Sequence, residues 1–268
     1  MKRITSAQNP EVKARAKLKE RRGRTKEGKF LVEGARELAR ALGAGVGLEA
    51  LYVCRELLNE AGQAVLRDAE TRGVPLTELS EPAFRALSMR ENPDGVVGVA
   101  LKQEKRLADL TLPEDALVVV CEGVEKPGNL GALLRTADGV GVHAVFTTGG
   151  GTDLENPNVV RSSMGSVFSR PVLTADGDEL RAWLRQEGFT LVAATPHTDR
   201  LYWNGEYRGK TALLLGAEDK GLSAAWLGAA DLRVKIPMRG LADSLNVATA
   251  GALLLYEALR QRLEPPAR

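Results

Sequence analysis

Between residues 114 and 268, short apolar runs alternate with stretches of helical pattern, and this alternation constrains the fold more than any other feature. The runs have the length and composition of buried β-strands and cover residues 116–121, 143–148, 171–173, 190–195, 211–216 and 232–236. Helices are predicted at 130–138, 157–167, 178–187, 223–229 and 245–262. Strands that alternate with helices form parallel sheets covered by helices on both faces. The pattern alone therefore predicts an α/β fold of the doubly wound type.

Residues 1–105 alternate in the same way on a smaller scale and predict a separate α/β domain. Strands are predicted at 30–32, 48–54, 74–76 and 96–101, and helices at 33–42, 55–71 and from Ser80 onward. The charged stretch 102–115 is interpreted as a linker. The predicted domains are therefore residues 1–105 and 114–268.

The net charge of +2 is distributed unevenly over the 268 residues. Residues 1–29 hold eleven Lys or Arg and three Glu, a net charge of +8, so the rest of the chain carries −6. This segment is predicted to form a basic helical arm that is broken near Gly23 and Gly28. A basic arm on a near-neutral body indicates a polyanionic partner. The alternative is a solvated helix face that binds nothing.

Cys54 and Cys121 each lie in an apolar run without metal-ligand spacing, which is typical of buried thiols in a reducing compartment. The N-terminus is basic but lacks the apolar core of a signal peptide. No uncharged stretch reaches the roughly 18 residues that a membrane helix needs. His143 and His197 are isolated, and no cluster with Asp or Glu predicts a metal site. We therefore expect a cytoplasmic protein with no metal and no membrane span.

The stretch Ile236–Val247 is interpreted as the end of a buried strand, a polar turn and the start of a buried helix. Pro237 ends the strand, and the Ser244 hydroxyl is predicted to cap the helix. The helix carries no charged residue over 245–256. A buried amide in its first turn, here Asn246, costs about 1–3 kcal/mol if it lacks hydrogen-bond partners. Asn246 is therefore either a functional residue or a support for the cap.

Two more stretches combine with this one into three motifs. Residues 129–137 read Asn-x-Gly-x-x-x-Arg-Thr-Ala, residues 215–222 read Leu-Gly-x-Glu-x-x-Gly-Leu, and residues 236–247 read Ile-Pro-Met-x-x-x-x-x-Ser-Leu-Asn-Val. In this order they resemble the motifs of the SpoU (TrmH-type) family of RNA ribose 2′-O-methyltransferases, within the SPOUT superfamily. The resemblance covers residues 114–262. Its main departure is Ala248, where the family frequently has Ser.

The resemblance implies S-adenosylmethionine (SAM) as the cofactor and a ribose of structured RNA as the substrate. It also implies a SPOUT-type parallel sheet with a deep trefoil knot, and a homodimer formed through this C-terminal domain. The implied catalytic residues are Asn129, Arg135, Glu218, Ser244 and Asn246. The implied cofactor-binding residues are Thr195, Leu215, Gly216, Ile236, Met238 and Leu245.

A second similarity concerns the N-terminal domain. Residues 30–34 and 92–99 look like parts of the substrate-binding domain, similar to ribosomal protein L30e, that is often fused to SpoU enzymes. Such a domain favours ribosomal (23S-type) RNA as the substrate. The alternatives are a tRNA ribose 2′-O-methyltransferase of the same family and a catalytically silent RNA-binding module on the same fold.

Two roles are open for Arg135. In the family an Arg at this motif position has been proposed as the base that takes the proton of the ribose hydroxyl. A guanidinium has a pKa above about 12 and is not expected to lose its proton. In the other role the cation clamps a phosphate and stabilises developing negative charge, while the proton leaves through water or Ser244. Glu218 is expected to orient Arg135 or Asn129, and Asn129 alternatively caps helix 130–138.

Overall fold

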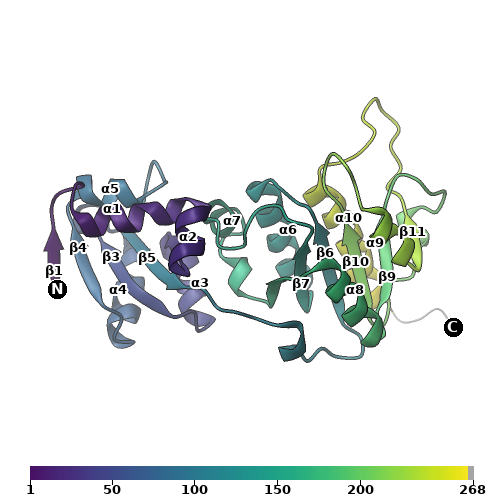
Figure 1. Ribbon diagram of the computed structural model, residues 1–268, viewed down its shortest axis with the longest axis horizontal. Coiled ribbons are helices and arrows are strands. Elements are labelled where there is room, and N and C mark those ends of the chain that lie inside the picture. Colours follow the sequence, from purple (N-terminus) through teal and green to yellow (C-terminus); the bar gives the residue numbers. More distant parts are fainter. Residues whose placement is uncertain (265–268) are drawn as a thin grey trace. The chain divides into compact units, whose positions relative to one another are not determined.

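The computed structural model describes residues 1–264, which form two compact units (Figure 1). Unit 1 consists of Met1–Glu104 and Asp153–Ser169, and unit 2 consists of Lys105–Thr152 and the chain from Arg170 onward. The sequence assigned residues 153–169 to the C-terminal domain, whereas their contacts group them with unit 1. Across residues 1–264, none of the helices is long and apolar enough to traverse a lipid bilayer.

Unit 1 is built on a five-stranded mixed sheet with the order β1-β4-β3-β5-β2. Its strands are β1 Lys2–Ile4, β2 Lys29–Glu33, β3 Leu48–Val53, β4 Leu76–Leu79 and β5 Val96–Leu101. Only β5 runs antiparallel to its neighbours, β2 and β3. The helices in residues 1–104 are α1 Pro10–Ala16, α2 Arg21–Glu27, α3 Ala35–Gly43, α4 Glu60–Thr71 and α5 Glu81–Leu87. The strand β1 was not predicted, and the strand expected at 74–76 begins at Leu76.

The basic arm is helical, and of its two predicted breaks the one near Gly28 is confirmed and the one near Gly23 is wrong. A 3-10 turn over Lys17–Lys19 follows α1, and α2 begins after Glu20. Gly23 lies inside α2, where a Cβ would come within 2.1 Å of the Lys17 carbonyl oxygen. A glycine is therefore needed there because α2 packs against the preceding turn, not because the helix ends. Gly28, with φ of +61°, does end α2 as predicted.

Residues 153–169 are fixed on unit 1 by ionic and aromatic contacts. Arg24, only 5% exposed, donates to both carboxylate oxygens of Asp153 over 2.9 and 2.7 Å. Phe168 stacks on Phe30 with ring centroids 6.2 Å apart. The helix predicted over 157–167 is shorter, because α7 covers only Pro157–Ser162. The backbone then turns through positive φ at Met164, an angle that a helix does not contain.

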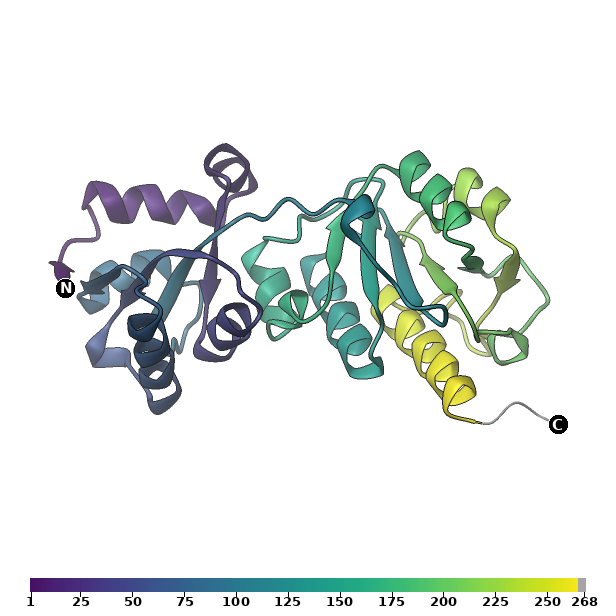
Figure 2. The same cartoon turned by 90° about the horizontal axis from the view of Figure 1, so that it is seen from below.

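Unit 2 contains a six-stranded sheet, all parallel, with the order β11-β9-β10-β6-β7-β8. The strands are β6 Leu117–Glu122, β7 Ala144–Thr148, β8 Val172–Thr174, β9 Thr190–Ala194, β10 Thr211–Leu215 and β11 Leu232–Val234. The helices are α6 Pro127–Val140, α8 Gly177–Gln186, α9 Ala224–Ala229 and α10 Val247–Leu263. Helices α6 and α10 lie on one face of the sheet, and α8 and α9 on the other (Figure 2). The predicted parallel α/β fold is thereby confirmed.

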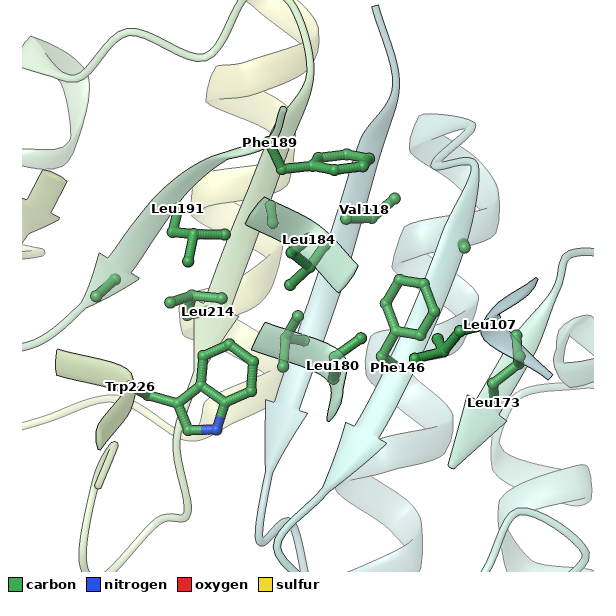
Figure 3. Close-up of a cluster of buried hydrophobic side chains, with 14 of the residues drawn as sticks. Leu107, Val118, Phe146, Leu173, Leu180, Leu184, Phe189, Leu191, Leu214 and Trp226 are labelled. Carbon is green, nitrogen blue, oxygen red and sulfur yellow. The ribbon is translucent and has the colours of Figure 1, made fainter. Parts of the chain in front are cut away.

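One hydrophobic core of unit 2 lies between the sheet and helices α8 and α9 (Figure 3). Alternate strand residues such as Val118, Phe146 and Leu214 point into this layer, where they meet Leu180 of α8 and Trp226 of α9. Each such side chain contributes about 1.5–3 kcal/mol by leaving water. Leu107, which the sequence placed in the linker, is buried in the same cluster.

The other face of the sheet depends on a close approach of α10 to α6. At Gly251 of α10, a Cβ would lie 2.4 Å from Leu133 Cδ1 and 3.0 Å from Leu215 Cδ1. A side chain at position 251 would therefore require the buried Leu133 side chain to shift, so the glycine favours close packing of the two helices. Both helices carry motif residues at their N-terminal ends, and their spacing therefore fixes the geometry between the motifs.

We expect Gly251→Ala to destabilise unit 2 by about 1–3 kcal/mol, because the added methyl group overpacks a rigid core. Gly228→Ala in α9 is the matched control, since no atom lies within 4 Å of its Cβ position. That change should be neutral or stabilising by about 0.5–1 kcal/mol. All three tryptophans, Trp183, Trp203 and Trp226, lie in unit 2, so urea unfolding followed by their fluorescence reports on this unit. Equal midpoints for the two variants would contradict the packing argument.

Candidate active site

The second motif forms a tight loop between β10 and α9. A Cβ on Gly216 would lie 2.1 Å from the carbonyl carbon of Gly221, so only glycine allows the loop to close on itself. Ala217 and Gly221 form an antiparallel bridge, in which the Gly221 N–H donates to the Ala217 carbonyl over 2.9 Å. The closed loop presents Glu218, which is half-buried, toward α6. The space left by the missing Cβ of Gly216 is thus filled by the protein's own backbone.

A chain of hydrogen bonds joins all three motifs. The Nδ2 of Asn129 donates to Oε1 of Glu218, and the Nδ2 of Asn246 donates to Oδ1 of Asn129 over 2.9 Å. The Oδ1 of Asn246 in turn accepts the backbone N–H of Ala248 over 2.9 Å. The partners are 89 and 117 residues apart in sequence. The structure therefore brings the predicted residues Asn129, Glu218 and Asn246 together.

The backbone N–H of Ala248 determines which side-chain atoms donate and which accept along this series of hydrogen bonds. Because the Ala248 N–H can only donate, Asn246 must present its oxygen to the helix and its NH₂ group to Asn129. Asn129 must then present its NH₂ group to the Glu218 carboxylate, which accepts. Each asparagine uses one amide hydrogen in the chain and retains a second. The site can therefore offer two N–H donors to the oxygen atoms of a ligand.

Two predicted local roles are wrong. Ser244 does not cap the last helix, because α10 begins at Val247 and its N-cap is Asn246. Asparagine caps helices as well as serine does, and Asn246 directly precedes the first helical residue, Val247. Asn129 does not cap α6 either, since that helix already begins at Pro127. Ser244 is exposed in the loop before α10.

Arg135 lies outside the hydrogen-bond chain. Its side chain is exposed on α6, and the Glu218 carboxylate that was expected to pair with Arg135 or Asn129 binds Asn129. Within residues 1–264, no carboxylate forms an ion pair with Arg135, so its charge is available to a ligand. Burial raises the pKa of the Cys121 thiol on β6 to about 12, which keeps this sulfur protonated and not nucleophilic.

Five of the six predicted cofactor-binding residues lie at the carboxyl ends of three neighbouring strands, and the sixth, Leu245, lies just before α10. Thr195 follows β9, Leu215 ends β10 and Gly216 comes next, and Ile236 and Met238 follow β11. The Thr195 N–H donates to the Val234 carbonyl over 2.9 Å, which ties the first of these ends to β11. Parallel sheets bind ligands at such strand ends.

These residues also fit the chemistry of SAM. Ile236, Met238 and Leu245 are half-buried apolar side chains, which suits the apolar face of an adenine ring. Gly216 has no side chain, so it can offer the cofactor only its backbone N–H and C=O groups. Within residues 1–264, no group of three His, Cys, Asp or Glu side chains is arranged to hold a metal ion.

One polar residue of the site was missed by sequence reasoning. Glu122 is the last residue of β6, and its Oε2 accepts the backbone N–H of Ser223 over 2.7 Å at the start of α9. The available signal was a carboxylate at the end of an otherwise apolar strand, next to the glycine of the following turn.

Comparison with known proteins identifies relatives over nearly the whole chain. Residues 116–256 match the SpoU rRNA Methylase family, and residues 9–98 match the MRM3-like substrate binding domain. The 23S rRNA (uridine(2479)-2′-O)-methyltransferase of Streptomyces viridochromogenes is 35% identical, over 98% of this chain and 93% of that protein.

Solved structures agree with these matches. A crystal structure of an RNA 2′-O ribose methyltransferase is 48% identical with a TM-score of 0.86, covering 98% of this chain and all of that one. An AdoMet-bound rRNA methyltransferase from Sinorhizobium meliloti is 32% identical with a TM-score of 0.90, covering 98% of this chain and 99% of that one. The resemblance carried by the three motifs is thus confirmed, and this chain belongs to the SpoU rRNA methylase family.

Proposed function

We propose that this protein transfers the methyl group of SAM to the 2′-hydroxyl of a ribose in ribosomal RNA. The observation that carries the proposal is the hydrogen-bond chain from Ala248 through Asn246 and Asn129 to Glu218, which unites the three family motifs in one site. The relatives support it, because they are named for 2′-O-methylation of RNA and one was solved with AdoMet bound. The match to a substrate-binding domain favours rRNA over tRNA.

In this reaction the site must hold the ribose in line with the donated methyl group. The remaining amide hydrogens of Asn129 and Asn246 suit phosphate or ribose oxygens, and Glu218 keeps Asn129 in a single orientation. SAM supplies a methyl group made electrophilic by its sulfonium. The residues that would hold it are Thr195, Leu215, Gly216, Ile236, Met238 and Leu245.

Arg135 serves in this proposal as a protonated clamp for an RNA phosphate. A guanidinium keeps its proton in proteins, and the Arg135 side chain is exposed on α6, the helix that also carries Asn129. A bidentate cation of this kind holds a phosphate in a fixed orientation. The exposed hydroxyl of Ser244 then offers the ribose proton a path to solvent.

The test uses SAM with a tritiated methyl group, incubated with purified ribosomal RNA and separately with tRNA. We expect label in ribosomal RNA, recovered after alkali as dinucleotides that resist cleavage because their 2′-oxygen is methylated. Label in tRNA alone would favour the tRNA alternative. Label on bases, or no label in either RNA, would contradict ribose methylation.

Within that assay, Asn246→Asp separates helix capping from substrate binding. The aspartate carboxylate still accepts the Ala248 N–H, so the unfolding midpoint should remain near that of the wild type. It has no N–H to donate to Asn129, so we expect methyl transfer to fall by at least about tenfold. Asn246→Ala, the comparison variant, should lose about 1 kcal/mol of stability as well. Full activity of Asn246→Asp would show that the hydrogen-bond chain plays no part in the mechanism.

We further propose that unit 1 binds RNA phosphates through its basic arm. Several cations of the arm are already neutralised: Lys2 pairs with Glu11, Arg3 with Glu78, Arg24 with Asp153, and Arg15 and Lys29 with Glu49. The net charge of +8 therefore overstates what RNA can use. Four exposed cations pair with no carboxylate within residues 1–264, namely Lys13, Lys17, Arg22 and Lys26.

Changing these four residues to Gln should weaken RNA binding and reduce its salt dependence. Each phosphate contact adds roughly 0.7–0.9 to the slope of log K against log salt, so the slope should fall by about 3. The matched control changes Lys2, Arg3, Arg55 and Arg85 to Gln, which removes the same charge from exposed cations that are paired. Fluorescence anisotropy with labelled rRNA measures both. Equal losses in the two variants would show that net charge alone matters.

Two features of the fold belong to the same proposal. Membership of the family supports a deep trefoil knot in unit 2, where the loop of residues 235–246 leads from β11 into α10. It supports an L30e-like fold for unit 1, whose mixed sheet is covered by helices. We also propose a cytoplasmic location, a reducing compartment in which free thiols such as Cys54 and Cys121 persist.

We also propose a homodimer formed through α10. This helix exposes Leu253 and Tyr256, which are 37% and 55% accessible, beside an open groove. The residues that line the groove are Tyr202, Thr249, Ala252, Leu253, Tyr256 and Glu257. An apolar helix face of this kind is stable when covered, and a second copy of the same helix has a matching surface.

Light scattering at micromolar concentration should give the mass of two chains. Leu253→Glu should shift the mass toward one chain, because it places a charge in the apolar interface, while the unfolding midpoint changes little at this partly exposed position. A wild-type mass of one chain, 28.8 kDa, would refute the dimer.

A further inference from the structure

The loop that carries Glu218 is fixed at both of its ends. At its start, the contact between Gly216 and Gly221 leaves no room for a side chain. At its exit, Leu222 and Trp226 are buried in the core of unit 2, with Ser223 between them as the first residue before α9. Between these points Ala217 and Gly221 are bridged, so Glu218 has little freedom as long as the exit holds.

Glu122 is the polar group that holds the exit. It ends β6, and its Oε2 accepts the Ser223 N–H over 2.7 Å, a bond between residues 101 apart in sequence. Its side chain occupies the space beside Gly149, where a Cβ would approach Glu122 Cγ to 3.0 Å. Gly149 has a φ of +69°, which glycine adopts readily. The turn after β7 is therefore shaped to accommodate the Glu122 side chain.

We propose that Glu122 is a positioning residue for methyl transfer, which acts by holding the Gly216–Ser223 loop where Glu218 accepts the Asn129 amide. The inference rests on the proposed function, and Glu122 lies outside the three sequence motifs described above. Loss of the carboxylate leaves the Ser223 N–H without its acceptor and releases the loop exit. Asn129 then loses its fixed orientation, since its NH₂ group depends on Glu218.

The effect should appear in the chemical step more than in RNA binding. We expect Glu122→Ala to lower kcat by roughly tenfold or more, as for loss of a hydrogen bond to a charged group, with KM for RNA changed less than about threefold. Glu122→Gln retains an oxygen that can accept the Ser223 N–H, and it should recover most of kcat.

A double-mutant cycle with Glu218→Ala tests whether Glu122 acts through Glu218. If it does, the variant that lacks both side chains should be no slower than Glu218→Ala alone. Multiplied losses in kcat would overturn the inference, because they would show two independent effects.

Asp231 supplies the matched structural control. Its Oδ2 accepts the Leu191 N–H over 2.8 Å in the same unit, but near the amino end of β9, away from the loops of the site. Asp231→Ala should therefore leave kcat close to that of the wild type at temperatures where the fold is intact. Equal losses of kcat for Asp231→Ala and Glu122→Ala would show a general loss of stability and would overturn the positioning role.

A second readout does not depend on activity. The side-chain amide of Asn129, observed by ¹⁵N NMR, should shift in Glu122→Ala and stay in place in Asp231→Ala and Glu122→Gln. An unchanged Asn129 signal in Glu122→Ala would overturn the inference, even if the enzyme methylates RNA as proposed. A shifted signal in a protein that methylates no RNA would support the positioning role and contradict only the proposed function.

Discussion

The hydrogen bond between Asn246 and Asn129 is the contact on which the site depends. It joins the first turn of α10 to the first turn of α6 over 2.9 Å, and the two residues are 117 positions apart in the chain. Such a bond forms only if the two helices approach closely along the same face of the sheet. Gly251 favours that approach, since a side chain there would require the buried Leu133 side chain to shift. The apolar packing between α6 and α10 thus determines the geometry of the hydrogen bond between Asn129 and Asn246.

The parallel sheet determines which loops can meet. All six strands of unit 2 point the same way, so the ends of β6, β9, β10 and β11 lie at one edge. The motif that follows β6 and the one that follows β10 become neighbours because those two strands pair directly. Glu122 and Glu218 use this proximity in different ways, since one binds backbone to hold the loop and the other binds an amide of the site.

Sequence reasoning predicted the parallel sheet, most of its elements and the set of residues at the strand ends. It erred where neighbours in space decide the role of a residue. Ser244 and Asn246 are both good capping residues, and only the start of α10 at Val247 shows that Asn246 is the cap. The missing Cβ of Gly216 accommodates the backbone of Gly221, a contact that the sequence does not reveal. Residues 153–169 have a helical pattern that does not reveal which unit they pack against.

The same limit applies to charge. Residues 1–29 contain eleven cationic residues. Some of their ion-pair partners, such as Glu49 and Glu78, lie on strands that are distant in sequence, so the sequence alone does not show which cations are paired. Once these pairs are known, the free cations gather on α1, the following turn and α2. The structure therefore shows which of the eleven cations pair with carboxylates within residues 1–264, whereas the net charge does not.

The direction of the amide chain also limits how a proton can leave in the proposed reaction. Methyl transfer from a sulfonium to a hydroxyl releases one proton, which some group near the ribose must accept. Asn129 and Asn246 point only N–H donors outward, because their oxygens are already used within the chain. They can bind the oxygens of the substrate, but they cannot take its proton. Binding and deprotonation must therefore be carried out by different groups, and the exposed Ser244 hydroxyl and solvent lie outside the chain where that second task can be done.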